Sequence, residues 1–332
     1  MQGDLILIFR VYLITLLWQV SFWPLVRRFF NGSPDQGWAV TRILFSLIVA
    51  LFAWELAYHK IALNTGWFLN GLGLLLGLIG LIFIKKGGWP TKIIWKNIAL
   101  SEYLFILGLF GIALVRGYQP DIDSLEKFMD YGFIKRYMMS PILPAMDMWW
   151  AGSQINYYSF GHFYSSVLVR MWGVELARGY NLLLGFLAGS GLTISYSVIR
   201  KILGKEIGEK KAGFSAFLGS LVVILGGNGH SLWYLLKNRN MNEYWYADAT
   251  RFIHNTIHEF PSYSFVVADL HGHLIDLPFV LLFLYFLIDW VKKPTKWTEL
   301  SMGVLFGVMM MTNTWDVAVY GLLLVVIGMY KL

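Results

Sequence analysis

The sequence predicts an all-α fold, that of a polytopic integral membrane protein, from its composition and its apolar runs. Of the 332 residues, 57% are hydrophobic, 17% aromatic and 14% charged, whereas soluble domains carry about 25% charged residues. Apolar runs close to the ~20 residues that a helix needs to cross a membrane recur along the whole length. No stretch remains for a separate soluble core, so we expect one membrane domain.

The charged residues and the missing cysteines narrow the class further. The formal net charge is +7, but lysines and arginines gather in short loops between apolar runs, as membrane orientation requires, so nucleic acid is not an expected partner. Without cysteine there is no disulfide framework, thiolate metal site or cysteine nucleophile. The first apolar run, Leu5 to Trp23, lacks a basic leader and a small-residue cleavage site and reads as a retained helix.

About nine transmembrane helices are predicted, over residues 4–23, 38–58, 66–84, 98–115, 178–200, 212–228, 271–291, 298–312 and 316–330. The loop with Arg27 and Arg28 is basic, as is the loop that follows the third span with Lys85, Lys86, Lys92 and Lys96. The charge rule places both loops in the cytoplasm. The fourth span then delivers residues 116–154, where acids outnumber bases, to the outer face.

Residues 155–173 form another apolar run. The distribution of basic loops indicates that this run does not cross the membrane. If it crossed, the loop at 200–211, which has five basic residues, would lie on the outer side against the charge rule. Polar and aromatic side chains are distributed through the run, and amphipathic rings prefer the membrane interface. We therefore expect an interfacial helix lying on or dipping into the outer surface. All later basic loops then face the cytoplasm.

Three polar patches share the outer face in this topology: residues 116–154, residues 229–273 and the turn at 312–316. The second patch contains five of the seven histidines: His230, His254, His258, His271 and His273. Random placement would rarely cluster histidines in this way. The convergence of the three patches is the main functional signal in the sequence.

The first patch contains the stretch "QPDIDSLEKFMD", with the acids Asp121, Asp123, Glu126 and Asp130. Its structural reading is a helix start, since Asp123 and Glu126 could form a capping box. Its functional reading rests on Glu126 and Asp130, whose i, i+4 spacing puts both carboxylates on one helix face. Such a pair suits a general base with a partner that binds metal or orients the acceptor.

In the second patch, Asp269, His271 and His273 alternate at the start of a span. In an extended segment all three would point the same way, whereas in a helix His271 would face away from the other two. Imidazole and carboxylate are common ligands of divalent ions, and polar groups entering hydrocarbon are costly unless they face a polar cavity. The pattern predicts a site for Mg²⁺ or Mn²⁺, or a phosphate site in which protonated histidine binds directly.

Weaker signals lie on the same face. Asp147 precedes Trp149 and Trp150, which are either interface anchors or a stacking wall for a sugar ring. Arg251 is either a solvated charge or a partner for a lipid phosphate, because its guanidinium matches phosphate oxygens.

The last turn and the glycine-rich stretches have structural readings as well. Trp315 and Asp316 follow Asn313 in a turn where a helix cap would also want Asn or Asp. The glycines of "GWFLNGLGLLLGLIGLIF" and "GFLAGSGLT" indicate close helix packing rather than nucleotide loops. No Walker, Rossmann, zinc-protease or serine-elbow pattern has the right flanks.

With these residues in view, the chain resembles the archaeal and chloroflexal "YYY" membrane protein family, a poorly characterised group related to the GT-C glycosyltransferases. The matching stretches are "EKFMD", "MDMWWAGSQINYYSFG", "HEFPSYSFVVADLHGH" and "NTWD", spread from about residue 100 to the end. Ser159 stands where the family's name implies a third tyrosine, so a contact from that hydroxyl need not be essential. Family members are often longer, and further helices after Leu332 are an expectation.

The resemblance implies N-terminal transmembrane helices over 1–97 and a GT-C-like catalytic core over 98–332, with juxtamembrane helices. It implies an enzyme that moves a sugar from a polyprenyl-phosphate donor to an acceptor at the outer face of the cell membrane. Asp130 or a nearby acid of the first outer loop would be the general base, with Glu126, Asp123 and Asp121 as the competing residues. Donor phosphate would contact His271, His273 and Arg251, and substrate would contact Asp147, Trp150, Tyr157, Tyr158, Glu259, Trp315 and Asp316.

Two other classes of function stay open. A transporter or flippase would use buried acids and histidines as a proton or ion relay. A noncatalytic assembly subunit would need none of them. Most ionisable residues crowd the outer ends of the predicted spans, which favours surface chemistry over a relay.

Overall fold

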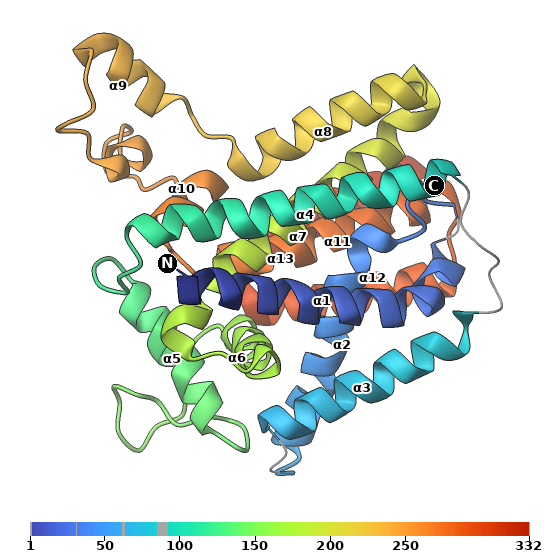
Figure 1. Cartoon of the computed structure of the whole chain (residues 1–332), viewed down its shortest axis with the longest axis horizontal. Helices are drawn as coiled ribbons and strands as arrows, with labels where there is room; N and C mark the ends of the chain where they lie inside the picture. The colour runs from blue at the N-terminus through green and yellow to red at the C-terminus, as the bar shows by residue number, and fades with distance from the viewer. Residues whose placement is uncertain (1, 31, 62–63, 85–91, 332) are drawn as a thin grey trace.

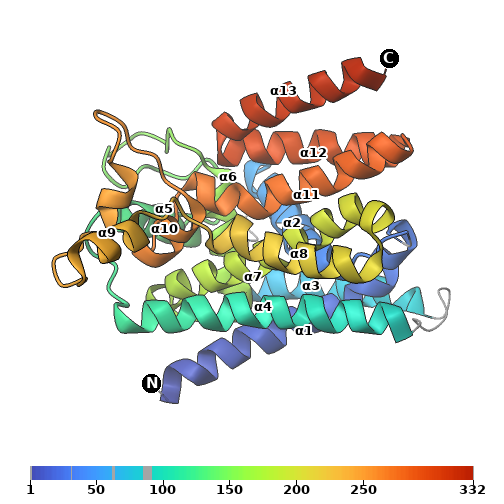
Figure 2. The same ribbon diagram turned by 90° about the horizontal axis from the view of Figure 1, so that it is seen from above.

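The computed structural model describes residues 2–30, 32–61, 64–84 and 92–331. Within these ranges the regular elements are helices, apart from one isolated bridge between Met146 and Gln154 (Figures 1 and 2). The prediction of an all-α polytopic membrane protein is confirmed. The nine predicted spans correspond to α1 (Gln2–Phe29), α2 (Trp38–Tyr58), α3 (Gly66–Ile82), α4 (Lys92–Tyr118), α7 (Leu176–Ile207), α8 (Glu209–Leu225), α11 (Gly272–Lys292), α12 (Lys296–Thr312) and α13 (Thr314–Lys331).

In the part of the chain that the structure describes, fewer helices than the nine predicted spans have the length and apolar composition that a membrane crossing needs. Among the described residues, α1, α2, α4, α7, α11 and α13 are each long and apolar enough to cross a membrane. α8 qualifies only together with α9 (His230–Asn238), from which it is bent by 78°. α3 and α12 have 17 residues each, slightly under the usual length. Six or seven helices therefore meet the criterion.

The long helices run alongside one another, and the basic loops meet at one end of the bundle (Figures 1 and 2). Lys292 Nζ donates to the carbonyl of Lys201 at 2.9 Å, and Lys331 Nζ donates to that of Trp290 at 3.0 Å. Lys60, after α2, bonds instead to the carbonyl of Leu143 at the opposite end. This separation agrees with the predicted loop assignment, although Lys85 and Lys86 lie outside the described residues.

The run at 155–173 is not among the helices long enough to cross, as predicted, but its helix is covered by protein instead of lying on the surface. α6 (Phe160–Trp172) has 13 residues, too few to cross, but all of them except Arg170 are buried, among α2, α3, α5 (Lys127–Met139), α7, α11 and α12. Its polar side chains bond to protein: the hydroxyls of Tyr164 and Ser46 lie 2.8 Å apart. Aromatic and polar residues in an apolar run fit a buried helix with internal partners as well as they fit an interface.

Glycines allow the close contact between α4 and α7, as the sequence predicts. A Cβ atom on Gly108 would lie 2.4 Å from the backbone nitrogen of Gly189, and one on Gly189 would lie 2.6 Å from the carbonyl oxygen of Phe105. α3 meets α1 in the same way, since a Cβ on Gly80 would lie 2.2 Å from the carbonyl oxygen of Ser21. The absence of side chains lets these backbones approach.

Candidate functional site

A short link before α11 positions the two central histidines. α10 (Pro261–Val267) ends at Ala268, which has a left-handed backbone (φ 62°), and the amide of Asp269 donates back to the carbonyl of Ser264 at 2.9 Å. His271 is the extended N-cap of α11, and His273 lies in its first turn. The segment is therefore neither fully extended nor fully helical. It directs the two imidazoles toward different carboxylates.

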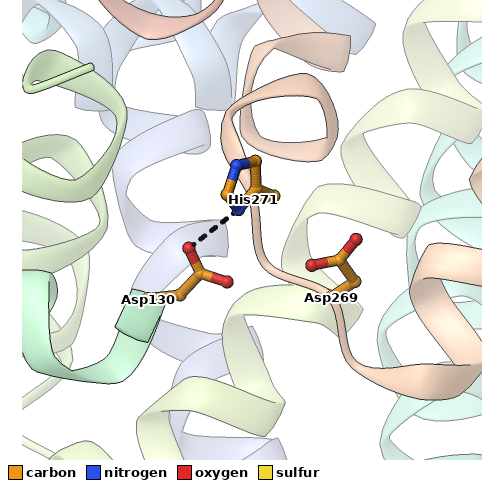
Figure 3. A group of neighbouring side chains, drawn as sticks. All are labelled: Asp130, Asp269 and His271. Atoms are coloured by element: carbon orange, nitrogen blue, oxygen red, sulfur yellow. Dashed lines mark ion pairs between the residues drawn. The ribbon is translucent and has the colours of Figure 1, made fainter. Parts of the chain in front are cut away.

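Glu126 and Asp130 of the first patch meet His271 of the second. Figure 3 shows Asp130 and His271 side by side, with Asp269 nearby. The Nδ1 atom of His271 lies 3.2 Å from Oδ1 of Asp130 and 3.5 Å from Oε2 of Glu126. Tyr157 hydrogen-bonds to the other ring nitrogen. The predicted i, i+4 relationship is confirmed, but the capping box is not formed: Glu126 is the N-cap of α5 and makes no side-chain cap bond.

Burial and neighbouring charges shift the pKa values of Asp130, His271 and Asp269 in different directions. Burial opposes ionisation of Asp130, but His162 and His271 together hold its pKa below the ordinary range. Burial likewise opposes protonation of His271, yet Asp130, Asp269 and Glu126 raise its pKa to about 9. Burial and the negative charges of Glu259 and Asp130 raise the pKa of Asp269 to about 7. At neutral pH an ionised Asp130 therefore faces a cationic His271.

His273 belongs to a second group of ligands. Its Nε2 atom lies 2.9 Å from Ser264 Oγ, 3.7 Å from Glu259 Oε2 and 3.9 Å from Asp269 Oδ2. Burial raises the pKa of Glu259. Asp269 thus lies between the two histidines, whose ring centroids are 6.0 Å apart.

These contacts regroup the predicted metal ligands. Instead of one trio of Asp269, His271 and His273, Asp269 is shared between a group with Asp130 and His271 and a group with Glu259 and His273. In each group the donor atoms lie within 4.8 Å of one another.

The first group fits a divalent cation better. Asp130 Oδ2 is buried and has no hydrogen-bond partner among the described residues, so it is free to bind a cation. Two carboxylates and one imidazole suit Mn²⁺, and Mg²⁺ also favours carboxylate oxygens.

A cleft of about 830 Å³ opens beside the histidines. Its lining brings together residues from three separate segments of the chain: Asn156, Tyr157, Tyr158, His271, His273, Asn313 and Trp315. Phe133 of α5 stacks on Tyr157 with ring centroids 5.2 Å apart. The cleft thus combines aromatic walls with convergent polar groups, as ligand sites commonly do.

Several predicted site residues lie apart from this cluster. Asp121 and Asp123 are exposed in the link between α4 and α5, and neither forms an ion pair with the histidines in the described part of the chain. Asp147 caps a turn by accepting from the backbone amides of Trp149 and Trp150, which lowers its pKa. Trp150 is exposed.

Arg251 and Asp316 have local partners. Arg251 donates to Thr250 Oγ1 at 2.9 Å and lies over the ring of Trp245. Its positive charge lowers the pKa of Glu259 only slightly in comparison with the effect of burial. Asp316 accepts from the side-chain amide of Asn313 at 2.7 Å, so the two side chains of that turn pair with each other.

The structure adds two residues that the sequence does not single out. His162 of α6 lies 3.0 Å from Asp130 Oδ1, and Ser264 of α10 contacts His273. A histidine in the middle of a short apolar run is a signal for the first. A lone serine on a seven-residue helix gives no comparable signal.

Comparison with known proteins gives one family. A family model described as "Uncharacterized membrane protein (DUF2298)" matches residues 48–331. No curated protein and no solved structure matches the chain. The family description names no reaction, so the resemblance to the YYY family and to GT-C glycosyltransferases stays a prediction.

Proposed function

The chain belongs to the DUF2298 family of membrane proteins, and from that premise we propose that it transfers a sugar from a polyprenyl-phosphate donor to an acceptor hydroxyl at one face of the membrane. One observation carries the proposal. Glu126 and Asp130 meet His271, about 140 residues further along the chain, beside an aromatic cleft at the end of the bundle opposite the basic loops. Acids and imidazoles at a membrane surface suit a substrate with a lipid tail and a phosphate head.

The donor phosphate would lie next to His271 and His273, which line the cleft. Asp130, Asp269 and His271 would hold a Mg²⁺ or Mn²⁺ ion, which would offset the charge that develops on the departing phosphate. Tyr157 would fix the ring of His271 through its hydrogen bond. Tyr158 and Trp315 would provide apolar surface for the sugar or the first isoprene units.

The geometry favours Glu126 over Asp130 as the general base. The side chain of Asp130 is fully buried, whereas that of Glu126 is 65% exposed, and a base must reach the proton that it removes. In the proposed step Glu126 takes the hydroxyl proton while the acceptor oxygen bonds to the anomeric carbon. The bond from that carbon to the phosphate oxygen breaks, and polyprenyl phosphate leaves with the electron pair, which inverts the configuration.

The proposed location is the cell membrane, with the cleft on the extracytoplasmic face. The argument is the charge rule: the loops rich in lysine and arginine lie at the other end of the bundle. A lipid-borne donor fits this face because it brings the activated sugar to a compartment without nucleotide sugars.

A transporter remains the second candidate, and ionisable groups inside the bundle favour it. Arg42 of α2 pairs with Glu102 of α4 at 2.6 Å, and Asp276 of α11 is fully buried. Such groups within spans are functional candidates by default. The Arg42–Glu102 pair joins neighbouring helices, however, and Trp38 also donates to Glu102, so a structural role accounts for it.

A transfer assay tests the proposal. The purified chain would be incubated in detergent with Mn²⁺ or Mg²⁺, a panel of polyprenyl-phosphate sugars with radiolabelled sugar, and hydroxyl acceptors. We expect labelled sugar to leave the lipid fraction with the wild type and not with Glu126→Gln, while Glu243→Gln, an exposed acid at the same end, behaves as the wild type. Release that Glu126→Gln leaves undiminished would reject Glu126 as the base, and no release with any donor would reject the reaction.

A further inference from the structure

α9 is an amphipathic helix whose apolar face points away from the protein. It follows α8 after the 78° bend and extends at the end of the bundle, beside η2 (Tyr246–Thr250) (Figures 1 and 2). At 100° per residue, the apolar side chains share one face: Leu232, Trp233, Leu235 and Leu236. All four are exposed, with Leu232 at 61% and Leu236 at 71%.

The polar face of α9 is the one that packs on protein. His230 Nδ1 lies 3.2 Å from the hydroxyl of Tyr244, and the ring of Tyr234 lies 4.9 Å from that of Tyr244. Both residues are half-buried, and no residue of α9 is fully buried. This orientation is the reverse of a helix that covers a soluble core, so the exposed apolar face needs an apolar environment.

The neighbouring helix identifies that environment as lipid. α8 exposes Phe214, Leu218 and Val222, one helical turn apart, along the side of a helix in the membrane bundle. The exposed apolar face of α9 comes next along the chain, directly after the bend. If acyl chains cover the apolar stripe on α8, the headgroups of the same bilayer lie at the bend where α9 begins.

Two cations mark the level of the headgroups. Lys237 Nζ lies 4.8 Å from the centroid of the Trp233 ring, and Arg239 is exposed directly after the helix. Tryptophan with lysine or arginine is typical of the membrane interface, where the ring is half in hydrocarbon and the cation contacts phosphate.

We propose that α9 lies flat in the interface of an anionic bilayer at the end of the bundle that holds the cleft, with Leu232, Trp233 and Leu236 in the acyl boundary and Lys237 and Arg239 at the phosphates. This arrangement does not depend on the proposed reaction. It anchors the segment that leads through η2 to Glu259 and then through α10 to the histidines.

The chain has no cysteine, so single cysteines can report the depth of α9 directly. Leu236→Cys and Leu232→Cys test the apolar face, and Asn238→Cys and Ser231→Cys on the polar face are matched controls. Each full-length variant would be labelled with the fluorophore NBD and reconstituted into vesicles of phosphatidylcholine and phosphatidylglycerol at about 3:1. Quenching would be measured with aqueous iodide and with lipids that carry a nitroxide on the upper acyl chain.

We expect the labels at 232 and 236 to be quenched by the acyl nitroxide and to be at least several-fold less sensitive to iodide than the label at 238. Equal iodide quenching at 236 and 238 would overturn the proposal. Protection of 232 and 236 from both quenchers would overturn it as well, because a protein surface would then cover α9. Circular dichroism and size exclusion would establish that each labelled variant is folded, and the two apolar positions serve as independent tests.

Discussion

The Nε2 atom of His162 lies 3.0 Å from Oδ1 of Asp130, and both side chains are almost completely buried. The other ring nitrogen lies 3.3 Å from the carbonyl oxygen of Tyr158, also an acceptor. The imidazole ring is therefore held between the Asp130 carboxylate and the Tyr158 carbonyl. His162 is thus a positioning residue: it fixes the carboxylate that contacts His271 without touching the cleft.

His162→Gln should weaken Mn²⁺ binding and sugar transfer by about 10–100-fold, the usual effect of removing a residue that orients a metal ligand. The amide can still donate to Asp130 but lacks the rigid ring that contacts Asp130 and the Tyr158 carbonyl at once. Calorimetric titration of the purified variant with Mn²⁺ gives the affinity, and the transfer assay gives the rate.

His230→Gln is the matched control, because His230 lies at the same end of the bundle and contacts Tyr244 instead. It should bind Mn²⁺ as the wild type does. An unchanged Mn²⁺ affinity for a folded His162→Gln variant would contradict the positioning role.

Neutralising each of the four acids of the first patch in turn should affect the transfer rate strongly at two positions and weakly at the other two. Asp130→Asn and Glu126→Gln should each lower transfer by roughly 100-fold or more, because one removes the partner of His271 and the other removes the base. Asp121→Asn and Asp123→Asn should stay within about threefold of the wild type, since both side chains are exposed away from the histidines. The measurement is the initial rate of transfer at saturating donor.

Only Asp130→Asn should also lower thermal stability, since it removes the buried carboxylate that contacts both His162 and the cationic His271. A loss of transfer confined to Asp121→Asn or Asp123→Asn would move the general base to the link between α4 and α5.

The spans could be predicted because apolarity over about 20 residues is a local property. α2 begins and ends at the predicted residues, and glycines such as Gly189 take the predicted close contacts. The location of α6 could not be predicted, because a polar aromatic run fits headgroups or buried protein partners equally well. Only long-range packing decides between them, here through contacts such as that between Tyr164 and Ser46.

The candidate site also combines features that follow from local sequence with features that depend on long-range packing. The i, i+4 spacing of Glu126 and Asp130 and the cluster at 269–273 are local patterns, and both are found side by side. The division of His271 and His273 between different acids depends on one left-handed residue, Ala268, and on where α11 begins. Neither is set by residue spacing.

Gly189→Ala should destabilise the bundle, although alanine favours a helix by about 1 kcal/mol over glycine. Its Cβ would lie 2.6 Å from the carbonyl oxygen of Phe105, so α4 and α7 must separate. Overpacking of this kind costs about 1–3 kcal/mol. The measurement is the unfolding temperature in detergent.

Gly303→Ala on α12 is the control, because its Cβ would meet nothing within 4 Å. It should leave the unfolding temperature unchanged or raise it. Equal behaviour of the two variants would contradict close packing between α4 and α7.

The pH dependence of binding should distinguish a metal ligand from a direct phosphate ligand at His271. Asp130, Asp269 and Glu126 raise the pKa of His271 to about 9, so below that pH a metal must displace its proton. Mn²⁺ affinity should therefore rise with pH, by up to about tenfold per unit, until about pH 9. An imidazolium that binds phosphate directly would instead keep its affinity up to about pH 9 and lose it above.

We expect the rising profile, measured by titration with Mn²⁺ between pH 6 and 9.5. Below about pH 7 it should become steeper, because Asp269, whose pKa is raised to about 7 by burial and by Glu259, must then also lose a proton. His271→Gln should remove one proton from the slope, whereas His254→Gln, an exposed histidine of the same patch, should not. A flat Mn²⁺ profile combined with phosphate binding that fails above pH 9 would assign His271 to the phosphate itself.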